Sequence, residues 1–328
     1  MDKFLITGCS GFVGRHFLDY LENNKVVCEV LGLDLDIMIP HRSFHHVKLN
    51  SNRVDLLDQN AIERIIYDFQ PQYILHLASF SSVAFSWQNP TLSFKNNVNI
   101  FLNILEAIRK YGLSTRILSI GSSEEYGKVL PSETPLTETA PLRPLSPYAV
   151  ARVAQEMLSK LYADSFGLDI VITRSFNHIG PRQKDVFVVS SFVRKIMEAK
   201  LAGLTEMTMT TGDLSIIRDF SDVRDVVKAY YMLLKKGHKG EIYNICSGIP
   251  TRLSEIIDLT SSILDIKVNT IVSPKLIRPN DNPLILGDNT KLRNHTGWSN
   301  TYLLKESIMD ILNYWKNLLT ENNAEHNY

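Results

Sequence analysis

The sequence has no excess of charge of either sign. Among its 328 residues, 35 are Lys or Arg and 35 are Asp or Glu, so the formal net charge at pH 7 is zero. Nucleic-acid binding needs concentrated positive charge, so this balance argues against a nucleic-acid partner. An anionic ligand would have to be held by individual cations. Hydrophobic residues make up 44% of the chain, which is enough for a sizeable core in one large or two modest domains.

Cysteine and long apolar runs are also scarce. The three cysteines, Cys9, Cys28 and Cys246, are widely spaced in apolar, strand-like surroundings, which suits a reducing compartment without a disulfide framework. No apolar run approaches the roughly 20 residues of a membrane helix, and the first residues begin a strand without a signal-peptide layout. The nine histidines and three cysteines have no metal-ligand spacing. We therefore expect a cytoplasmic protein with no membrane and no metal partner.

Strand and helix patterns alternate in the first half of the chain. Strands are expected at residues 3–6, 26–33, 47–54, 73–77, 116–120 and 169–174. Helices are expected at residues 12–22, 61–68, 92–110 and 147–166. Strands separated by helices of this length indicate a parallel sheet with right-handed crossovers. The predicted fold class is α/β, with a Rossmann-type doubly wound parallel sheet that binds NAD(P) over residues 1–175.

The pattern changes after residue 175. A turn is expected at 177–181, and strands at 206–211 and 241–245. Helices are expected at 186–202, 222–235, 253–264 and 303–319. This half predicts a smaller mixed α/β lobe for the substrate over residues 176–320, interleaved with the end of the first domain. The polar residues 321–328 are expected to form a frayed tail.

Three glycines follow the first predicted strand and open the first helix. The backbone must turn tightly at Gly8, approach a pyrophosphate at Gly11, and let the helix pack close to the sheet at Gly14. The phosphate charge would meet the free N–H groups at the positive end of the helix. The loop, with Phe12 and Val13, therefore predicts a dinucleotide site; a structural turn without a ligand is the alternative.

Asp34 ends the second predicted strand, about 20 residues after Gly14, the spacing typical of a ribose-binding carboxylate. A carboxylate there accepts hydrogen bonds from the adenosine ribose and repels a 2′-phosphate, which favours NAD(H). NADP(H) is the alternative, because Arg42 is close in sequence. Asp55 and Leu56 are expected near the adenine; an ordinary helix cap is the alternative for Asp55.

A hydroxyl, a carboxylate and a phenol are the candidate catalytic groups. Ser122 and Glu124 fall at the end of the strand at 116–120, and Tyr148 and Arg152 lie on the helix at 147–166. A phenol moves a proton at neutral pH only if a cation stabilises the phenolate, because its free pKa is about 10. A spacing of four places Tyr148 and Arg152 on one helix face. Turn chemistry alone is the alternative explanation for Ser122 and Glu124.

Together these segments resemble the extended short-chain dehydrogenase/reductase family. The resemblance covers nearly the whole chain and is strongest to its nucleotide-sugar branch, around the GDP-mannose 4,6-dehydratases and, closest, the GDP-4-keto-6-deoxy-D-mannose reductases. The matching segments are 7–14 (TGCSGFVG), 76–79 (HLAS), 121–127 (GSSEEYG), 143–148 (RPLSPY), 176–181 (FNHIGP), 218–225 (RDFSDVRD), 246–248 (CSG) and 278–279 (RP).

The resemblance implies a role for each matching residue. Tyr148 would exchange a proton with the sugar 4-oxygen, and Ser122 would hydrogen-bond the same oxygen. Glu124 falls where the dehydratases keep a glutamate that removes the C5 proton. The other implied contacts are Leu77, Ala78 and Ser79 for the cofactor, and Ser81, Asn177, Arg218 and Arg278 for the nucleotide diphosphate. A surface ion pair is the alternative for each of the two arginines.

Arg152 departs from the family pattern, which has a lysine that binds the nicotinamide ribose and lowers the tyrosine pKa. Arginine keeps the positive charge and the N–H donors, but it does not lose its proton in practice. Electrostatic activation of Tyr148 could therefore persist, whereas a proton relay through residue 152 could not. On the family geometry, Arg152→Lys is expected to keep or raise activity.

The function implied by the resemblance is the NAD(P)H-dependent reduction of the 4-keto group of a nucleotide-linked 4-keto-6-deoxyhexose. The nucleotide would be GDP, and the product would serve surface polysaccharide synthesis. An NAD-dependent 4,6-dehydratase is the first alternative, supported by Glu124 and Asp34. A 4-epimerase or 4-dehydrogenase is the second, and a non-catalytic dinucleotide-sensing protein is the third.

A homodimer is also expected. Related enzymes pair two helices from each subunit into a four-helix bundle across a twofold axis. The helices at 92–110 and 147–166 have more apolar residues than one sheet face needs. These residues are Phe94, Phe101, Ile108, Met157, Leu158 and Leu161.

Overall fold

A seven-stranded parallel sheet forms the body of the molecule. The computed structural model describes residues 1–277 and 282–325, with side chains to residue 321. The strand order is β3-β2-β1-β4-β5-β6-β10, a doubly wound order that starts at β1 and extends in both directions. The strands are β1 (Asp2–Thr7), β2 (Cys28–Asp34), β3 (Val47–Arg53), β4 (Tyr73–His76), β5 (Arg116–Ser122), β6 (Asp169–Ser175) and β10 (Ile242–Ile245). The predicted fold class is confirmed.

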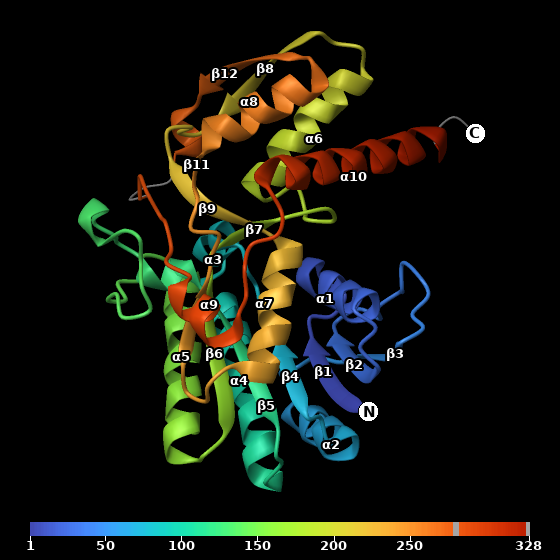
Figure 1. The fold of residues 1–328 in the computed structure, drawn as a ribbon, viewed down its shortest axis with the longest axis vertical. Helices are drawn as coiled ribbons and strands as arrows, with labels where there is room; N and C mark the ends of the chain where they lie inside the picture. Colours follow the sequence, from blue (N-terminus) through green and yellow to red (C-terminus); the bar gives the residue numbers. More distant parts are fainter. Residues whose placement is uncertain (278–281, 326–328) are drawn as a thin grey trace.

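Helices cover both faces of this sheet (Figure 1). One face packs against α2 (Gln59–Phe69), α4 (Pro90–Tyr111) and α5 (Pro147–Ser165), and the other against α1 (Phe12–Asn23) and α7 (Val223–Lys236). The apolar residues of α4 recur every three or four positions, as a helix with one buried face requires. Phe101 and Ile108, expected at a dimer surface, belong instead to this core and are almost wholly buried.

The smaller lobe stands above the carboxyl ends of the sheet strands in Figure 1. Its core lies between helices and one small sheet: α6 (Val188–Leu201), α8 (Leu253–Leu264), α10 (Leu304–Glu325), β8 (Glu206–Thr211) and β12 (Lys267–Val272). A second small sheet connects this lobe to the body through β7 (Asn177–Ile179), β9 (Ile217–Asp222) and β11 (Pro250–Arg252). Between these segments the chain returns to the body to form α7 and β10.

The sequence did not predict several short elements. These are α3 (Val83–Gln88), α9 (Thr290–Thr296), β9, β11, β12, and the strand β7 inside the expected turn. β12 pairs with β8 alone and its residues are mostly exposed, so it lacks the apolar alternation that identifies a strand. Helix α10 continues to Glu325, into the segment expected to fray, and residues 326–328 lie outside the described part of the chain.

Membrane-spanning helices and metal-binding clusters are both absent from the part of the chain that the structure describes. Within 1–277 and 282–325, no helix is long and apolar enough to cross a bilayer. The same residues contain no group of three or more His, Cys, Asp or Glu side chains placed to hold a metal ion. Cys9, Cys28 and Cys246 are buried free thiols.

Candidate active site

The glycine loop has a shape that side chains would block. Gly8 has φ of +70°, and a Cβ added there would lie 2.9 Å from the Ala78 nitrogen. A Cβ at Gly14 would lie 2.5 Å from the Cys9 carbonyl oxygen. The Gly8 nitrogen also donates to the Leu33 oxygen at 2.8 Å, which ties the loop to the end of β2. These contacts require glycine and keep the loop close to the sheet.

The first turn of α1 suits an anion. Gly11, the N-cap residue, has no side chain to occupy the first N–H groups, and the turn contains no acidic residue. The N–H groups and the positive end of the helix dipole are therefore free to bind a phosphate. Phe12 stacks on His178 of the smaller lobe with ring centroids 6.0 Å apart, and Val13 packs against the core. The loop therefore fits a dinucleotide pyrophosphate.

The Asp34 carboxylate lies against this loop. Its oxygens accept hydrogen bonds from the Ser10 nitrogen at 2.9 Å and the Leu35 nitrogen at 2.8 Å. Arg42 points elsewhere: it donates to Asn23 at 3.0 Å and lies 3.9 Å from Asp19. The loop after β2 turns back toward the end of α1, so closeness in sequence did not bring Arg42 to Asp34.

The remaining cofactor candidates follow the strand ends. The nitrogens of Leu77 and Ala78 donate to the Thr7 carbonyl and hydroxyl oxygens, which places both residues beside the glycine loop. Asp55 is exposed and accepts from the Leu57 nitrogen at 2.9 Å, a local turn contact. Leu56 is buried in the core.

Ser122 ends β5 and begins a 3-10 turn (Ser123–Tyr126). Its hydroxyl accepts from the Glu124 nitrogen at 3.2 Å, and its own nitrogen donates to Glu125 Oε1 at 2.6 Å. This capping box fixes the turn. The Glu124 side chain is exposed. Gly127 closes the turn at φ +57°, where a Cβ would lie 1.6 Å from the Arg143 oxygen.

Glu125, which the sequence analysis did not single out, is wholly buried behind Ser122. Burial, followed by the charge of Glu156, raises the pKa of Glu125 well above its ordinary value. Glu156 itself forms a two-fold ion pair with Arg174, with both N–O distances at 2.8 Å. Burial thus disfavours the charged form of Glu125, whose Oε1 accepts the hydrogen bond that holds the Ser122 backbone.

Tyr148 and Arg152 lie in the first two turns of α5, facing the sheet. The helix begins at Pro147, with the Ser146 hydroxyl accepting from the Ala149 nitrogen at 3.1 Å. Arg152 Nε donates to the Tyr148 phenol oxygen at 3.2 Å, and the guanidinium lies 5.3 Å from the phenol ring centroid. The predicted spacing of four thus brings the cation and the phenol into direct contact.

Neutral groups accept the other hydrogen bonds of Arg152. Nη2 donates to the Ser79 hydroxyl at 2.6 Å. Nη1 donates to the Ile120 carbonyl oxygen at 2.9 Å and to Gln155 Oε1 at 2.7 Å. Gln155 was not among the residues predicted from the sequence, although it lies three residues after Arg152 and therefore on the same helix face. The structure thus joins Ser79, a cofactor candidate, to the catalytic candidates.

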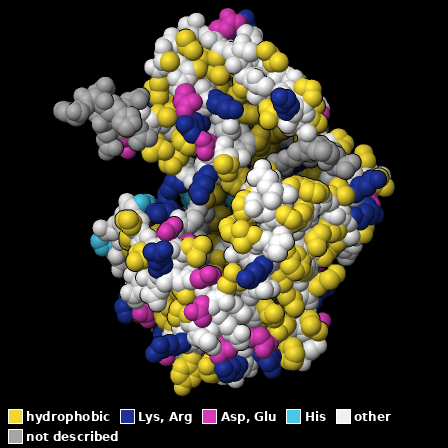
Figure 2. All heavy atoms as spheres, turned by 180° about the vertical axis from the view of Figure 1, so that it is seen from behind, with side chains coloured by type: hydrophobic (Ala, Val, Ile, Leu, Met, Phe, Trp, Pro, Cys, Tyr) yellow, Lys and Arg dark blue, Asp and Glu magenta, His cyan; other side chains and the backbone are white. Residues whose placement is uncertain are grey.

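The substrate candidates are more widely spread. Ser81 and Asn177 are exposed, just before α3 and in β7 respectively. Arg218 in β9 donates from Nη1 to the carbonyl oxygens of Ile217 at 2.9 Å and Asn282 at 2.8 Å. Arg278 lies outside the described residues. Figure 2 shows a hollow between the smaller lobe and the body, with Lys and Arg side chains along its edge.

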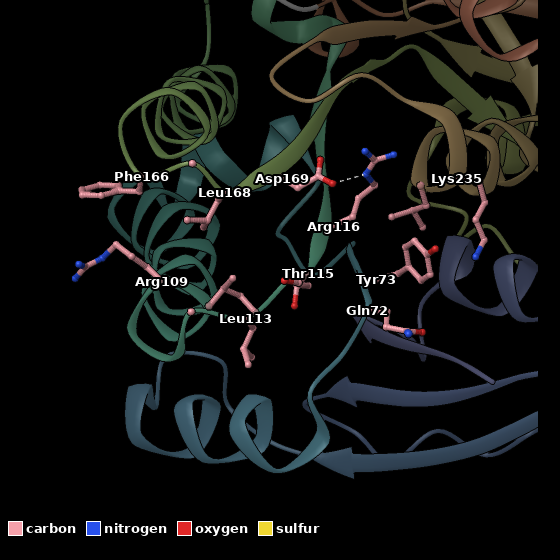
Figure 3. A pocket seen from close by; sticks show the side chains of 15 residues that line it. Gln72, Tyr73, Arg109, Leu113, Thr115, Arg116, Phe166, Leu168, Asp169 and Lys235 are labelled. Carbon is pink, nitrogen blue, oxygen red and sulfur yellow. Dashed lines mark hydrogen bonds and ion pairs between the residues drawn. The ribbon is translucent and has the colours of Figure 1, made fainter.

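A separate cavity of about 710 Å³ lies far from these residues, at the amino ends of β4, β5 and β6. The ends of α4, α5 and α7 meet there, and Arg116 pairs with Asp169 at 2.9 Å beside it (Figure 3). In open α/β sheets ligands bind at the carboxyl ends of the strands. The glycine loop, Ser122 and Tyr148 are at that edge, which is therefore the candidate active site.

Comparison with known proteins gives matches along almost the whole chain. The family model described as GDP-mannose 4,6 dehydratase matches residues 5–311. The GDP-6-deoxy-D-mannose reductase of Pseudomonas aeruginosa is 32% identical, over 97% of this chain and 99% of the relative. The solved structure of RMD from the same organism, complexed with NADPH, is similar with a TM-score of 0.83 and 30% identity, over 97% of this chain and 100% of that one. UDP-glucose 4-epimerase of Thermotoga maritima, solved with UDP-glucose, is similar with a TM-score of 0.86 and 28% identity, over 97% and 99%.

Proposed function

The chain belongs to the GDP-mannose 4,6-dehydratase family of nucleotide-sugar enzymes within the extended short-chain dehydrogenases/reductases, and we propose that it reduces a GDP-linked 4-keto-6-deoxyhexose at C4. The observation that supports this most is the contact between Arg152 Nε and the Tyr148 phenol oxygen at 3.2 Å. The direction of the reaction is supported by the full-length similarity to a relative named as a reductase.

This chain has residues suited to binding each part of the dinucleotide coenzyme. The glycine loop and the first turn of α1 would bind its pyrophosphate, and Asp34 its adenosine ribose. A bound nicotinamide coenzyme supplies the hydride. NAD(H) is favoured over NADP(H), because the carboxylate of Asp34 is directed at this loop while Arg42 pairs with Asp19 and Asn23.

The side chains of the chain then supply the proton. As the ketone carbon accepts the hydride, Tyr148 donates its phenol proton to the ketone oxygen, and the ketone becomes an alcohol. The phenolate that remains is stabilised by the adjacent guanidinium of Arg152 and regains a proton from solvent. The Ser122 hydroxyl, fixed at the end of β5, donates a hydrogen bond to the same oxygen and stabilises the charge that develops there.

The nucleotide diphosphate would lie in the hollow between the lobes. Arg218 on β9 is the first candidate to bind it, because a planar guanidinium matches phosphate oxygens well. Asn177 and Ser81 are the other candidates, together with Arg278. Two of these positions, Asn177 and Arg218, come from the small sheet between the body and the lobe.

A 4,6-dehydratase is the second candidate, and Glu124 is the observation in its favour. Its side chain is exposed on the 3-10 turn directly after Ser122, where a base for the C5 proton would be needed. The family model itself is named for this reaction.

One experiment separates the two reactions. The protein is incubated with GDP-mannose alone, and separately with GDP-4-keto-6-deoxymannose plus NADH or NADPH. We expect the ketone to be consumed with oxidation of the reduced coenzyme, and Tyr148→Phe to abolish this turnover with little change in coenzyme affinity. Loss of water from GDP-mannose alone, detected by mass spectrometry, would assign the dehydratase reaction instead.

We also propose a homodimer formed through α4 and α5. Trp87 and Met157 are each 63% exposed, and their exposed apolar neighbours are Leu92, Phe94, Val150 and Leu161. Hydrophobic side chains gather on this side of the body in Figure 2, and patches of this kind mark interaction sites. Light scattering at micromolar concentration should give a dimer mass, and Met157→Glu should shift it toward the monomer. Met309→Glu, on α10, is the matched control and should leave the mass unchanged.

A further inference from the structure

A row of buried polar side chains runs along the inner face of α5 below the catalytic tyrosine. After Tyr148 come Arg152, Gln155 and Ser159, which are 4%, 1% and 0% exposed. Helical spacing places all of them against β5, in a position that apolar residues usually occupy. The polar row therefore needs an explanation beyond packing.

This row of polar side chains is organised around the hydrogen-bond donors of one guanidinium, that of Arg152. The described contacts of Arg152 use four of the five guanidinium N–H groups, with Tyr148, Ile120, Gln155 and Ser79 as acceptors. Gln155 is itself anchored, because its Nε2 donates to the Ser119 hydroxyl at 2.9 Å and to the Ile120 oxygen at 3.1 Å. The Gln155 amide oxygen is thereby aimed at the guanidinium and has no freedom to turn away.

A lysine does not fit this arrangement. Its ammonium is a single point at the end of an unbranched chain, whereas the contacts of Arg152 spread over three nitrogens in a planar fork. We infer that an ammonium held close to Tyr148 would leave the Gln155 amide oxygen without the donor that Nη1 of Arg152 now supplies at 2.7 Å. That oxygen would then be buried without a donor, which costs its full desolvation.

We propose that Gln155 is a positioning residue, paired with Arg152, which adapts this active site to arginine in place of lysine. Gln155 and Ser79 hold the guanidinium from two sides so that Nε points at the Tyr148 oxygen and one N–H of Nη2 stays available for a bound hydroxyl. Arginine and glutamine form one functional unit. Arg152→Lys therefore lowers activity while Gln155 is present, which differs from the expectation drawn from the family geometry.

A double-mutant cycle tests this pairing. The wild type, Gln155→Met, Arg152→Lys and the double variant are compared; Met has a similar size and no amide acceptor. Gln155→Met should lower kcat about tenfold in the wild-type background and about twofold or less in the Arg152→Lys background. The KM for the sugar nucleotide should change by less than about threefold, because Gln155 does not line the substrate hollow.

Ser159→Ala is the matched control. Ser159 is buried in the same row and hydrogen-bonds Ser119, but it does not contact Arg152, so its effect on kcat should be small in both backgrounds. If Gln155→Met lowers kcat by the same factor in both backgrounds, Gln155 only supports the fold and the pairing is wrong.

The turnover part of this test rests on the proposed function, and a second readout separates the two. The dissociation constant for NADH or NADPH, measured by coenzyme fluorescence, should show the same background dependence. Absence of turnover in the wild type with either sugar nucleotide would overturn the proposed reaction. Equal effects of Gln155→Met on coenzyme affinity in both backgrounds would overturn the pairing.

Discussion

Two buried arginines lie close to the turn that begins at Ser122 and are held in opposite ways. Arg152 is 4% exposed and Arg174 is 3% exposed, and each lies over a tyrosine ring, at 5.3 Å from the centroid of Tyr148 and 4.9 Å from that of Tyr126. Arg174 forms a two-fold ion pair with Glu156. Arg152 has no carboxylate partner within the described residues and is held by neutral oxygens alone.

The difference shows how a buried charge can still act on the groups around it. The carboxylate of Glu156 fixes the guanidinium of Arg174 and offsets part of its charge, so this pair joins β6 to α5. Neutral oxygens fix the guanidinium of Arg152 without cancelling its charge. Burial, followed by this charge, lowers the pKa of the neighbouring His76 to about 3, so the field of Arg152 reaches its surroundings. The same field would stabilise a phenolate at Tyr148.

The largest effect should follow from breaking the paired arginine. Arg174→Met would leave Glu156 buried without its cation, and we expect the free energy of unfolding to fall by about 3–5 kcal/mol. Turnover per folded molecule should fall much less. Denaturant unfolding followed by circular dichroism gives the first quantity, and kcat corrected for folded protein gives the second. Arg174→Met combined with Glu156→Leu should recover much of the stability; a loss as large as in the single variant would contradict the comparison.

Arg152→Met should show the reverse pattern. The phenolate loses its cation, so kcat should fall at least about 100-fold, with a smaller loss of stability than Arg174→Met causes. Steady-state kinetics and unfolding on the same preparations measure both. Full activity in Arg152→Met would remove residue 152 from the catalytic set and leave the proton to Ser122, Glu124 or water.

Asp34 extends the comparison to a negative charge. Like Arg152, it has no oppositely charged partner within the described residues, and its carboxylate accepts only backbone N–H groups. Its charge should therefore act on a 2′-phosphate. Asp34→Ser should narrow the preference for NAD(H) over NADP(H) by about tenfold, or about 1.4 kcal/mol. Dissociation constants for the two coenzymes measure this. A wild type that already prefers NADPH would show that another cation dominates this site.

The smallest effect concerns Glu125, beside the Arg174 pair. Because its pKa is raised in the folded protein above the ordinary 4.5, the folded state binds the extra proton. Its contribution to stability is complete below that pH and decreases as pH rises toward the folded pKa. Glu125→Gln, which keeps the contact to the Ser122 nitrogen, should make stability less dependent on pH above 4.5. An unchanged slope in unfolding experiments across this range would mean that Glu125 is not the titrating group.

Local rules predicted the parts of the site that depend on local geometry. Gly8, Gly14 and Asp34 were recognisable because a tight turn and a strand end impose fixed spacings. The contact of Tyr148 with Arg152 followed from helical periodicity, and the same rule extended by three residues would have found Gln155. Gln155 matters because Arg152 has no carboxylate partner within the described residues and is held by neutral oxygens instead. Only the packed structure shows this.

Contacts between distant segments were not predictable from one sequence. Glu125 drew no attention beside Glu124, because the charged groups that act on its carboxyl, Glu156 and Arg174, come from the distant segments α5 and β6. Arg42 was placed near Asp34 by sequence distance alone, whereas the loop returns to Asp19 and Asn23 on α1. Strand β12 was missed because its partner β8 lies more than fifty residues earlier and β12 itself is mostly solvent-exposed.

The chain leaves the sheet to form part of the small lobe and then returns to complete the sheet. This order affects how the chain folds while it is being synthesised on the ribosome. Strand β6 ends at Ser175, but β10, which covers its outer edge, is made only after β7, β8, β9 and α7 have emerged. During that interval the nascent sheet has an open edge on which another chain can pair. The lobe is also incomplete until α10 emerges, because Ile308, Ile311, Leu312 and Trp315 complete its core. Chains that stop before residue 304 should therefore depend on chaperones and be degraded quickly, even though every proposed catalytic residue is already present.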